Sequence, residues 1–289
     1  MASMDSELGS VFSLWRYPVK SMMGEELATV EVKQYGVVGD RAYALVAEAD
    51  GKVASAKNPG KWPTLFAFRA AFLQDSADET AISSVRITLP DGTATSSMKQ
   101  DVNQTLSKSL GKNVILAVTE GGRISGVQSP MPGGWTAQAE EYWPDIDGRD
   151  HRDTVTDFKL PVGTFFDGAI VHLVTTATLD QLHELYPHGR FEAPRFRPNI
   201  VVNSAGGRKG FVEQAWVDRE LQIGDQVRLR VTGPCARCVM TTLPQGDLPK
   251  DPGILRTAVQ HNHGHVGVYA AVVQGGTIKR SDRVRLTPS

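Results

Sequence analysis

Leu221-Gln222-Ile223-Gly224-Asp225-Gln226-Val227-Arg228-Leu229 and Ile278-Lys279-Arg280-Ser281-Asp282-Arg283-Val284-Arg285-Leu286 echo each other in the C-terminal part of the chain. Each pattern is typical of a tight turn around an aspartate that leads into a strand. In both strands apolar residues alternate with charged ones, which places the apolar side chains on one face of a sheet. Two copies do not make a repeat protein, but they favour a closed or strongly bent sheet.

Short β-branched or alternating runs continue over the whole chain. The expected strands cover 11–17, 27–34, 42–47, 66–73, 85–89, 114–118, 170–175, 199–202, 226–231 and 266–273. One helix is expected over 101–110, where Asp101 can cap the start and Gly111 the end. A second begins near Thr178, which opens a capping-box pattern. Many short strands and few helices predict a mainly β protein with some α, built as two β-barrel-like domains.

The segment from about 120 to 162 is rich in glycine, proline and aspartate and is expected to be a long loop. Such a loop is a natural domain boundary, which we place near residue 125. The prediction is an N-terminal β-barrel domain over 8–120 and a second domain over 125–289. The loop contains three aromatic residues, Trp135, Tyr142 and Trp143, and is a candidate for a lid or a partner-binding surface. The alternative is that it only connects the two domains.

Composition limits the class of protein. Of 289 residues, 40% are hydrophobic and 22% charged, which is typical of a soluble globular protein, and a formal net charge of -1 argues against a general grip on nucleic acid or anionic lipid. The first 20 residues lack a secretory pattern, and no apolar run is long enough to span a bilayer. A cytoplasmic, reducing setting is therefore expected.

Both cysteines of the chain lie within four residues, in Gly233-Pro234-Cys235-Ala236-Arg237-Cys238. In a reducing compartment this spacing indicates a metal or redox site. Zinc would need further ligands besides the two cysteines. The only plausible ones are the histidines of His261-Asn262-His263-Gly264-His265, which are expected to alternate along an extended strand. A thioredoxin-like dithiol would need a βαβ context, and two thiols without a role remain a further alternative.

A second cluster is basic. Lys20 and Ser21 follow the first expected strand, Arg41 precedes a later one, and Arg195-Phe196-Arg197-Pro198-Asn199 leads into a third. Ammonium, hydroxyl and guanidinium groups are the donors that a phosphate or oxyanion needs. Each residue taken alone is more typical of a solvated surface than of a binding site.

Four motifs in this order resemble the MOSC-domain proteins, and more specifically the two-domain group that includes the mitochondrial amidoxime reducing component and its bacterial relatives. The motifs are Tyr17-Pro18-Val19-Lys20-Ser21, Gly39-Asp40-Arg41, Phe196-Arg197-Pro198-Asn199-Ile200, and Cys235-Ala236-Arg237-Cys238 followed by Thr241-Thr242. The resemblance covers nearly the whole chain and implies an N-terminal MOSC β-barrel domain followed by a MOSC domain.

The resemblance implies a molybdenum cofactor, in which a pterin dithiolene holds the metal. Cys238 matches the family's molybdenum ligand, and Cys235 is expected to support it without ligating. The matching phosphate anchors are Lys20, Ser21, Arg41 and Arg197, and Asn199 and Arg237 match positions that line the cofactor. Asp167 matches an acidic residue beside the metal and is expected to deliver protons. The chain departs from the family pattern directly after it, where Gly168 and Ala169 replace hydroxyl residues.

The implied activity is the reduction of N-hydroxylated small molecules. With no further cysteines and no dinucleotide-binding glycine motif, electrons are expected from a separate protein, such as a ferredoxin, a cytochrome b5-like protein or a flavoprotein reductase. The alternative is a carrier of molybdenum cofactor or of sulfur, similar to the C-terminal part of cofactor sulfurases. A pyridoxal phosphate domain is not expected.

Overall fold

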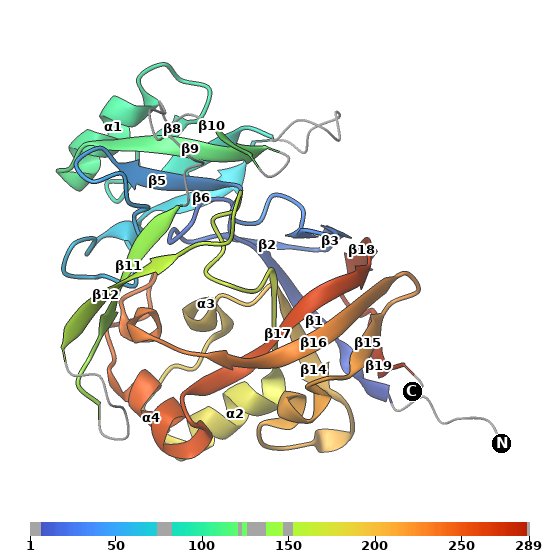
Figure 1. Ribbon diagram of the computed structural model, residues 1–289. Helices are drawn as coiled ribbons and strands as arrows, with labels where there is room; N and C mark the ends of the chain where they lie inside the picture. Colours follow the sequence, from blue (N-terminus) through green and yellow to red (C-terminus); the bar gives the residue numbers. More distant parts are fainter. Residues whose placement is uncertain (1–6, 74–82, 121–122, 126–136, 147–152, 288–289) are drawn as a thin grey trace.

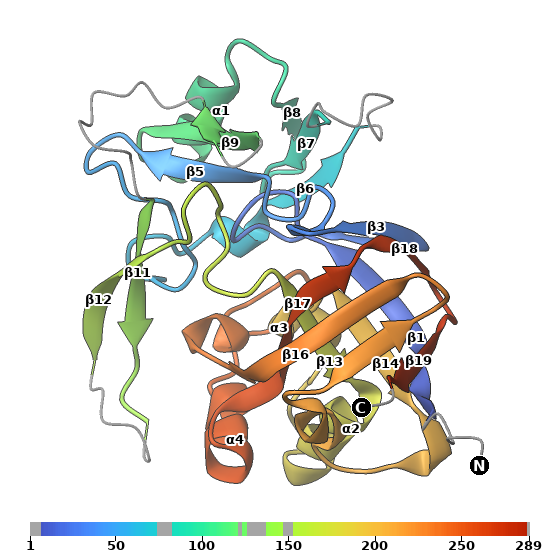
Figure 2. The same cartoon turned by 45° about the vertical axis from the view of Figure 1, so that its right-hand side comes forward.

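The computed structural model describes residues 7–73, 83–120, 123–125, 137–146 and 153–287. It confirms the mainly β class, with 41% of residues in strands and 19% in helices. Figures 1 and 2 show the strands β5 to β9 gathered at one end of the molecule and a large curved sheet, with α2 and α4 beside it, at the other.

The large sheet closes into a seven-stranded barrel. Its strands, in order around the barrel, are β14 (Ile200–Ser204), β13 (Val171–Thr175), β17 (His265–Gln274), β16 (Val227–Ala236), β15 (Glu220–Ile223), β19 (Arg283–Leu286) and β1 (Glu7–Arg16). Pairing of β1 with β14 closes the ring, and β2 (Glu25–Leu27) extends from β1. All neighbours are antiparallel except β13 and β14. The expected closed sheet is therefore confirmed.

The two echoing segments are neighbours in this barrel. β15 and β19 pair antiparallel, with Leu221 opposite Leu286 and Ile223 opposite Val284. The turn at Gly224 has φ +58°, and a Cβ there would lie 2.8 Å from the Asp282 carboxylate. Glycine permits both this conformation and this close approach. The equivalent strands of the two patterns, β16 and β19, therefore lie on either side of β15 in the barrel.

The barrel takes its first strand from the N-terminal half. β1 pairs with β14 on one side and β19 on the other. Conversely, β18 (Gly276–Lys279) pairs with β3 (Thr29–Lys33), which also pairs with β4 (Gly36–Val37). The division of the chain into 8–120 and 125–289 stays a prediction, but the strand pairing joins the two halves tightly.

The rest of the N-terminal half consists of small sheets around a shared core. These are β5 (Tyr43–Ala47) with β9 (Val114–Glu120) and β10 (Arg123–Ser125), and β6 (Arg69–Phe72) with β7 (Val85–Thr88) and β8 (Ala94–Ser96). The helices α1 (Val102–Leu110) and η1 (Leu65–Ala67) complete it. Its buried core includes Trp62 and Phe68 together with Val239 and Met240 from the C-terminal half. Apolar packing therefore also continues across the junction.

The expected end of one helix is correct, and the expected start of another is wrong. Gly111 ends α1 in the left-handed conformation, as expected. In α2 (Thr176–Leu185) the cap is Thr175, whose hydroxyl accepts the Thr178 N–H, so the cap predicted at Thr178 was three residues late. A threonine at either position suits the helix start, and the chain path out of β13 decides between them.

The segment expected to be a long loop contains an antiparallel hairpin, β11 (Gln138–Trp143) and β12 (Thr154–Lys159). Ion pairs bind this hairpin to the N-terminal half: Lys52 Nζ lies 2.9 Å from Glu140 Oε1 and 2.7 Å from Asp157 Oδ1. Lys61 Nζ lies 3.0 Å from Glu140 Oε2. Trp135, the third aromatic of the expected loop, falls outside the described residues.

The remaining helices are short: α3 (Ala193–Phe196), α4 (Gly253–Asn262), η2 (Ala205–Gly207), η3 (Val212–Trp216) and η4 (Val239–Thr242). The histidine run does not form one extended strand, contrary to expectation. His261 lies in α4, His263 caps it with φ +52°, and His265 begins β17. None of the helices in the described part of the chain is long and apolar enough to cross a bilayer.

Candidate functional site

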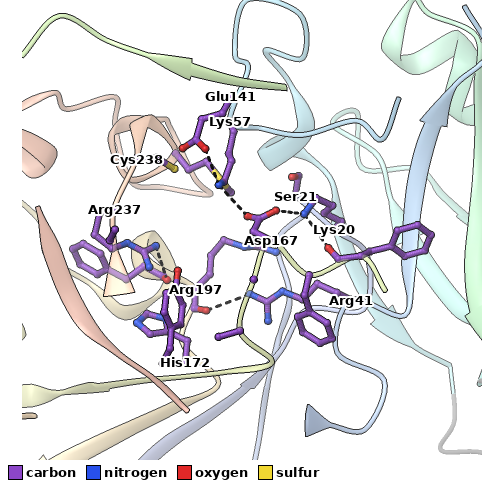
Figure 3. A pocket seen from close by; sticks show the side chains of 18 of the residues that line it. Lys20, Ser21, Arg41, Lys57, Glu141, Asp167, His172, Arg197, Arg237 and Cys238 are labelled. Atoms are coloured by element: carbon purple, nitrogen blue, oxygen red, sulfur yellow. Dashed lines mark hydrogen bonds and ion pairs between the residues drawn. The ribbon is translucent and has the colours of Figure 1, made fainter. Parts of the chain in front are cut away.

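A cavity of about 330 Å³ opens where the hairpin, the N-terminal half and the barrel meet. All eight predicted site residues line it: Lys20, Ser21, Arg41, Asp167, Arg197, Asn199, Arg237 and Cys238. The sequence expectation missed further residues of the lining: Lys57, Glu141, Phe165, Phe166, His172, Met240 and Tyr269. Trp143, which was named only for a possible lid or partner surface, also lines the cavity. Figure 3 shows Lys20 and Lys57 reaching toward Asp167, with Cys238 next to Lys57.

The barrel explains why residues far apart in sequence meet. β1 runs antiparallel to β14, with Leu14 opposite Ile200, so the end of β1 and the start of β14 share one end of the barrel. Lys20 and Ser21 follow β1, and Arg197 and Asn199 precede β14. Residues placed just outside strand ends therefore form one rim.

Three of the site residues have unusual backbone conformations. Ser21, Arg41 and Arg197 have φ values of 61°, 50° and 53°, and they are three of the seven non-glycine residues with positive φ in the described part of the chain. A side chain in the left-handed region costs roughly 1–2 kcal/mol. Glycine would be more stable at these positions, so the cost points to a use for the side chains.

One wall of the cavity carries two guanidinium groups. Arg197 is 6% exposed and donates from Nη1 to the Met22 carbonyl oxygen at 2.6 Å, whereas its Nη2 has no hydrogen-bond partner among the described residues. Arg41 forms an ion pair with the buried carboxylate of Asp40. Burial, assisted by the charge of Arg41, lowers the pKa of Arg197 to about 10. A buried cation with an unused donor is suited to an anionic group.

Lysines and carboxylates form the middle of the cavity. Lys20 Nζ donates to the Phe165 carbonyl oxygen at 2.9 Å and forms an ion pair with Asp167. Lys57 Nζ lies 3.1 Å from Glu141 Oε2 and 3.5 Å from Asp167 Oδ2. Burial raises the pKa of Asp167, but the charges of Lys20 and Lys57 outweigh it and hold the pKa below its usual value. Asp167 is therefore ionised at neutral pH.

Burial also acts on the two lysines. It lowers the pKa of Lys20 despite the nearby Asp167. For Lys57 the negative charges of Asp167, Cys238 and Glu141 outweigh burial and raise the pKa. No motif pointed to Lys57 in the sequence, and Glu141 lies in a segment that was expected to be a loop.

The two cysteines have different surroundings. Cys238 lines the cavity and is partly buried, whereas Cys235 is fully buried and accepts a hydrogen bond from Arg237 Nη1 at 2.7 Å. Burial raises the pKa of Cys238, and Lys57 opposes it only in part. Burial also raises the pKa of Cys235, but Arg237 and His172 outweigh it and lower the pKa to about 6.

Arg237 connects the two cysteines to the lining. Its Nη2 donates to the Phe196 carbonyl oxygen at 2.8 Å, which fixes the guanidinium between Cys235 and the start of β14.

The four-ligand zinc set considered from the sequence is not assembled: across the described residues, no three histidine, cysteine, aspartate or glutamate side chains converge as a metal site. The only thiol that faces the cavity in the described structure is therefore Cys238.

Comparison with known proteins matches both halves of the chain. A model of the MOSC N-terminal beta barrel domain matches residues 8–120, and a model of the MOSC domain matches residues 162–285. Mitochondrial amidoxime-reducing component 1 of Mus musculus is 24% identical over 242 residues, which are 82% of this chain and 66% of that protein. Mitochondrial amidoxime reducing component 2 of Rattus norvegicus is 24% identical over 249 residues, 82% of this chain and 67% of that protein. The chain thus spans about two thirds of these relatives.

Solved structures are similar at lower identity. The YUAD protein from Bacillus subtilis has 11% identity and a TM-score of 0.46, with 96% of this chain and 94% of that chain covered. YiiM from Geobacillus stearothermophilus has 18% identity and a TM-score of 0.31, with 42% of this chain and 55% of that chain covered.

Proposed function

Since the chain is a two-domain MOSC protein, with a MOSC N-terminal β-barrel domain followed by a MOSC domain, we propose that it is a molybdenum cofactor-dependent reductase of N-hydroxylated compounds. MOSC domains are associated with molybdenum cofactor binding. The relatives named as amidoxime reducing components suggest the direction of the chemistry.

The observation that carries the proposal is a cavity with a cationic wall and a single thiol. The buried Arg197 with its unused Nη2 suits the terminal phosphate of such a cofactor, and Lys20, Ser21 and Arg41 line the same cavity. Cys238 would supply a thiolate to a metal that is already bound by sulfur. Asn199 and Arg237 would line the pterin between the two ends. The donor set therefore fits both chemical ends of the cofactor.

When bound, the cofactor supplies two-electron oxygen-atom transfer. The net reaction is R–NHOH + 2 e⁻ + 2 H⁺ → R–NH₂ + H₂O. The chain's own residues would then position the substrate and supply the protons. Asp167 is ionised, so it would have to take up a proton before it could deliver one, and the ammonium groups that it contacts are Lys20 Nζ and Lys57 Nζ. Lys57 also opposes the negative charge of Glu141 beside Cys238.

The two electrons would come from a separate protein. A ferredoxin, a cytochrome b5-like protein or a flavoprotein reductase has the required chemistry, and the substrate would be a small N-hydroxylated molecule. We propose cytoplasmic action for the chain.

Elemental analysis of the purified protein tests the proposal, with Cys238→Ala and Cys235→Ala as a matched pair. We expect stoichiometric molybdenum in the wild type and in Cys235→Ala, and its loss in Cys238→Ala. Molybdenum that survives Cys238→Ala would remove this residue from the ligand set.

Turnover is the second part of the test. The molybdenum-loaded protein should reduce benzamidoxime or a hydroxylaminopurine with at least one of the three kinds of electron donor. A loaded protein that turns over neither, but releases its cofactor to an apo-enzyme, would be a carrier instead.

A further inference from the structure

Two guanidinium groups of the cavity wall share one aromatic ring. The Cζ of Arg197 lies 4.2 Å from the ring centroid of Tyr17, and the Cζ of Arg41 lies 4.7 Å from it. Tyr17 is 1% exposed and does not line the cavity itself. The ring therefore lies behind the wall that presents the two cations.

Each arginine also approaches a second ring, but not the same one. Arg41 lies 5.9 Å from the centroid of Phe166, and Arg197 lies 5.5 Å from that of Phe66. Both distances are longer than those to Tyr17. A cation over an aromatic face is attracted by the ring quadrupole, and the attraction grows when both are buried. Tyr17 is the partner that the two arginines have in common.

The backbone of Tyr17 belongs to the same arrangement. Its N–H donates to Asp40 Oδ1 at 2.8 Å, and Asp40 Oδ2 accepts from Asn199 Nδ2 at 2.9 Å. Asp40 also forms the ion pair with Arg41. One buried carboxylate thus fixes the ring and one of the guanidiniums.

The ring of Tyr17 contacts both guanidiniums, whereas its hydroxyl lacks a hydrogen-bond partner in the described part of the chain. The hydroxyl oxygen is also buried. A buried hydroxyl without a partner costs stability. Any contribution of Tyr17 to the arginine pair must therefore come from its ring.

We propose that Tyr17 is a positioning residue whose ring holds Arg41 and Arg197 together, so that both guanidiniums face one phosphate group in the cavity. The charge of Arg41 acts against that of Arg197, and attraction of both cations to the shared ring offsets that repulsion before the anion arrives. The identification of the phosphate with that of the cofactor rests on the proposed function. The ability to bind a phosphate does not.

The test measures binding of inorganic phosphate to the full chain, produced in cells that cannot make molybdenum cofactor. Isothermal titration calorimetry gives Kd for the wild type, Tyr17→Phe, Tyr17→Leu and Tyr17→Met. We expect Tyr17→Phe to bind within about twofold of the wild type and both aliphatic variants to bind roughly tenfold more weakly. Rescue by phenylalanine separates the ring from the hydroxyl.

Phe72→Leu is the matched control. Arg16 Cζ lies 4.6 Å from the Phe72 ring centroid, and neither residue lines the cavity. This variant removes a comparable cation–π contact and should leave phosphate affinity within about twofold of the wild type.

Several results would overturn the proposal: wild-type affinity in Tyr17→Leu or Tyr17→Met, an equal loss in Tyr17→Phe, no phosphate binding by the wild type, or failure of both aliphatic variants to fold. Molybdenum content, measured separately on protein from cofactor-producing cells, tests the proposed function. Wild-type molybdenum together with unchanged phosphate affinity in the aliphatic variants would reject only the role of Tyr17.

Discussion

Arg195 and Arg197 are separated by a single residue, yet their guanidiniums serve different parts of the molecule. Arg195 is fully buried and donates to the carbonyl oxygens of Arg190, Thr241, Leu243 and Pro249. Arg197, in the left-handed conformation at the end of α3, faces the cavity with one donor unused among the described residues. One arginine holds the chain that follows Cys238, and the other is available to a ligand.

This division predicts opposite consequences for two similar substitutions. Arg195→Gln should lower the free energy of unfolding by about 3 kcal/mol or more, because several buried carbonyl groups lose a charged donor. Arg197→Gln should change it by no more than about 1 kcal/mol but abolish molybdenum retention. Urea unfolding and elemental analysis of both proteins measure this. Equal loss of stability in the two variants would contradict the division.

Substitutions at Ser21 can distinguish the cost of its backbone conformation from the role of its side chain. Its φ of 61° favours glycine, while its Oγ accepts the Ala56 N–H at 3.0 Å. Both Ser21→Gly and Ser21→Ala lose this acceptor, but only glycine relieves the backbone. We expect the glycine variant to be about 1 kcal/mol more stable than the alanine variant in urea unfolding. Both should retain less molybdenum than the wild type, and an alanine variant at least as stable as the glycine variant would argue against strain.

Substitutions of Lys57 and Lys52 can be compared as a test and its control. Both lysines lie close to acidic residues of the β11–β12 hairpin, but only Lys57 lines the cavity. Lys57→Met removes the cation that opposes Glu141 and, together with Lys20, Asp167 beside Cys238, which disfavours the Cys238 thiolate. We expect molybdenum content to fall roughly tenfold. Lys52→Met removes one exposed and one partly buried ion pair of the hairpin and should change stability by about 0.5 kcal/mol, with molybdenum content unchanged. Similar molybdenum loss in both proteins would indicate an effect of the hairpin as a whole.

Glu213 gives a pH-dependent prediction away from the cavity. Its buried Oε2 accepts from Thr175 Oγ1 at 2.8 Å and Thr178 Oγ1 at 2.6 Å, whereas Oε1 has no partner among the described residues. Burial raises its pKa above the usual 4.5 despite these hydrogen bonds. The folded state therefore holds this proton more tightly than the unfolded state, so the contribution of Glu213 to stability is full below pH 4.5 and falls as pH rises through the raised pKa.

Glu213→Gln removes this titration while keeping an acceptor for both threonines. We expect the variant to gain about 1 kcal/mol or more over the wild type at pH 8 and to lose that advantage near pH 4. Urea unfolding at a series of pH values measures the difference. A difference that is constant with pH would show that Glu213 does not titrate in this range.

Local patterns predicted much of the fold. Period-two alternation and aspartate turns indicated the strands β16 and β19, because these signals act between residues close in the chain. The same reasoning failed for the histidine run, since His263 leaves α4 in a left-handed turn that alternation does not reveal. It also missed the β11–β12 hairpin, whose acidic residues Glu140 and Asp157 are matched by Lys52, far away in the sequence.

The sequence by itself determined the mainly β class and the chemical types gathered at the site, because strand periodicity and ordered motifs are properties of neighbouring residues. Only the tertiary structure decided that β1 closes the barrel of the other half. It also decided that Lys57 and Glu141 join the cavity, and that Arg195 is buried among backbone carbonyl groups. These outcomes depend on burial and on pairs such as Lys20 and Asp167, which are 147 residues apart. No local pattern carries the energy of such contacts, since it arises only when the folded chain brings them together.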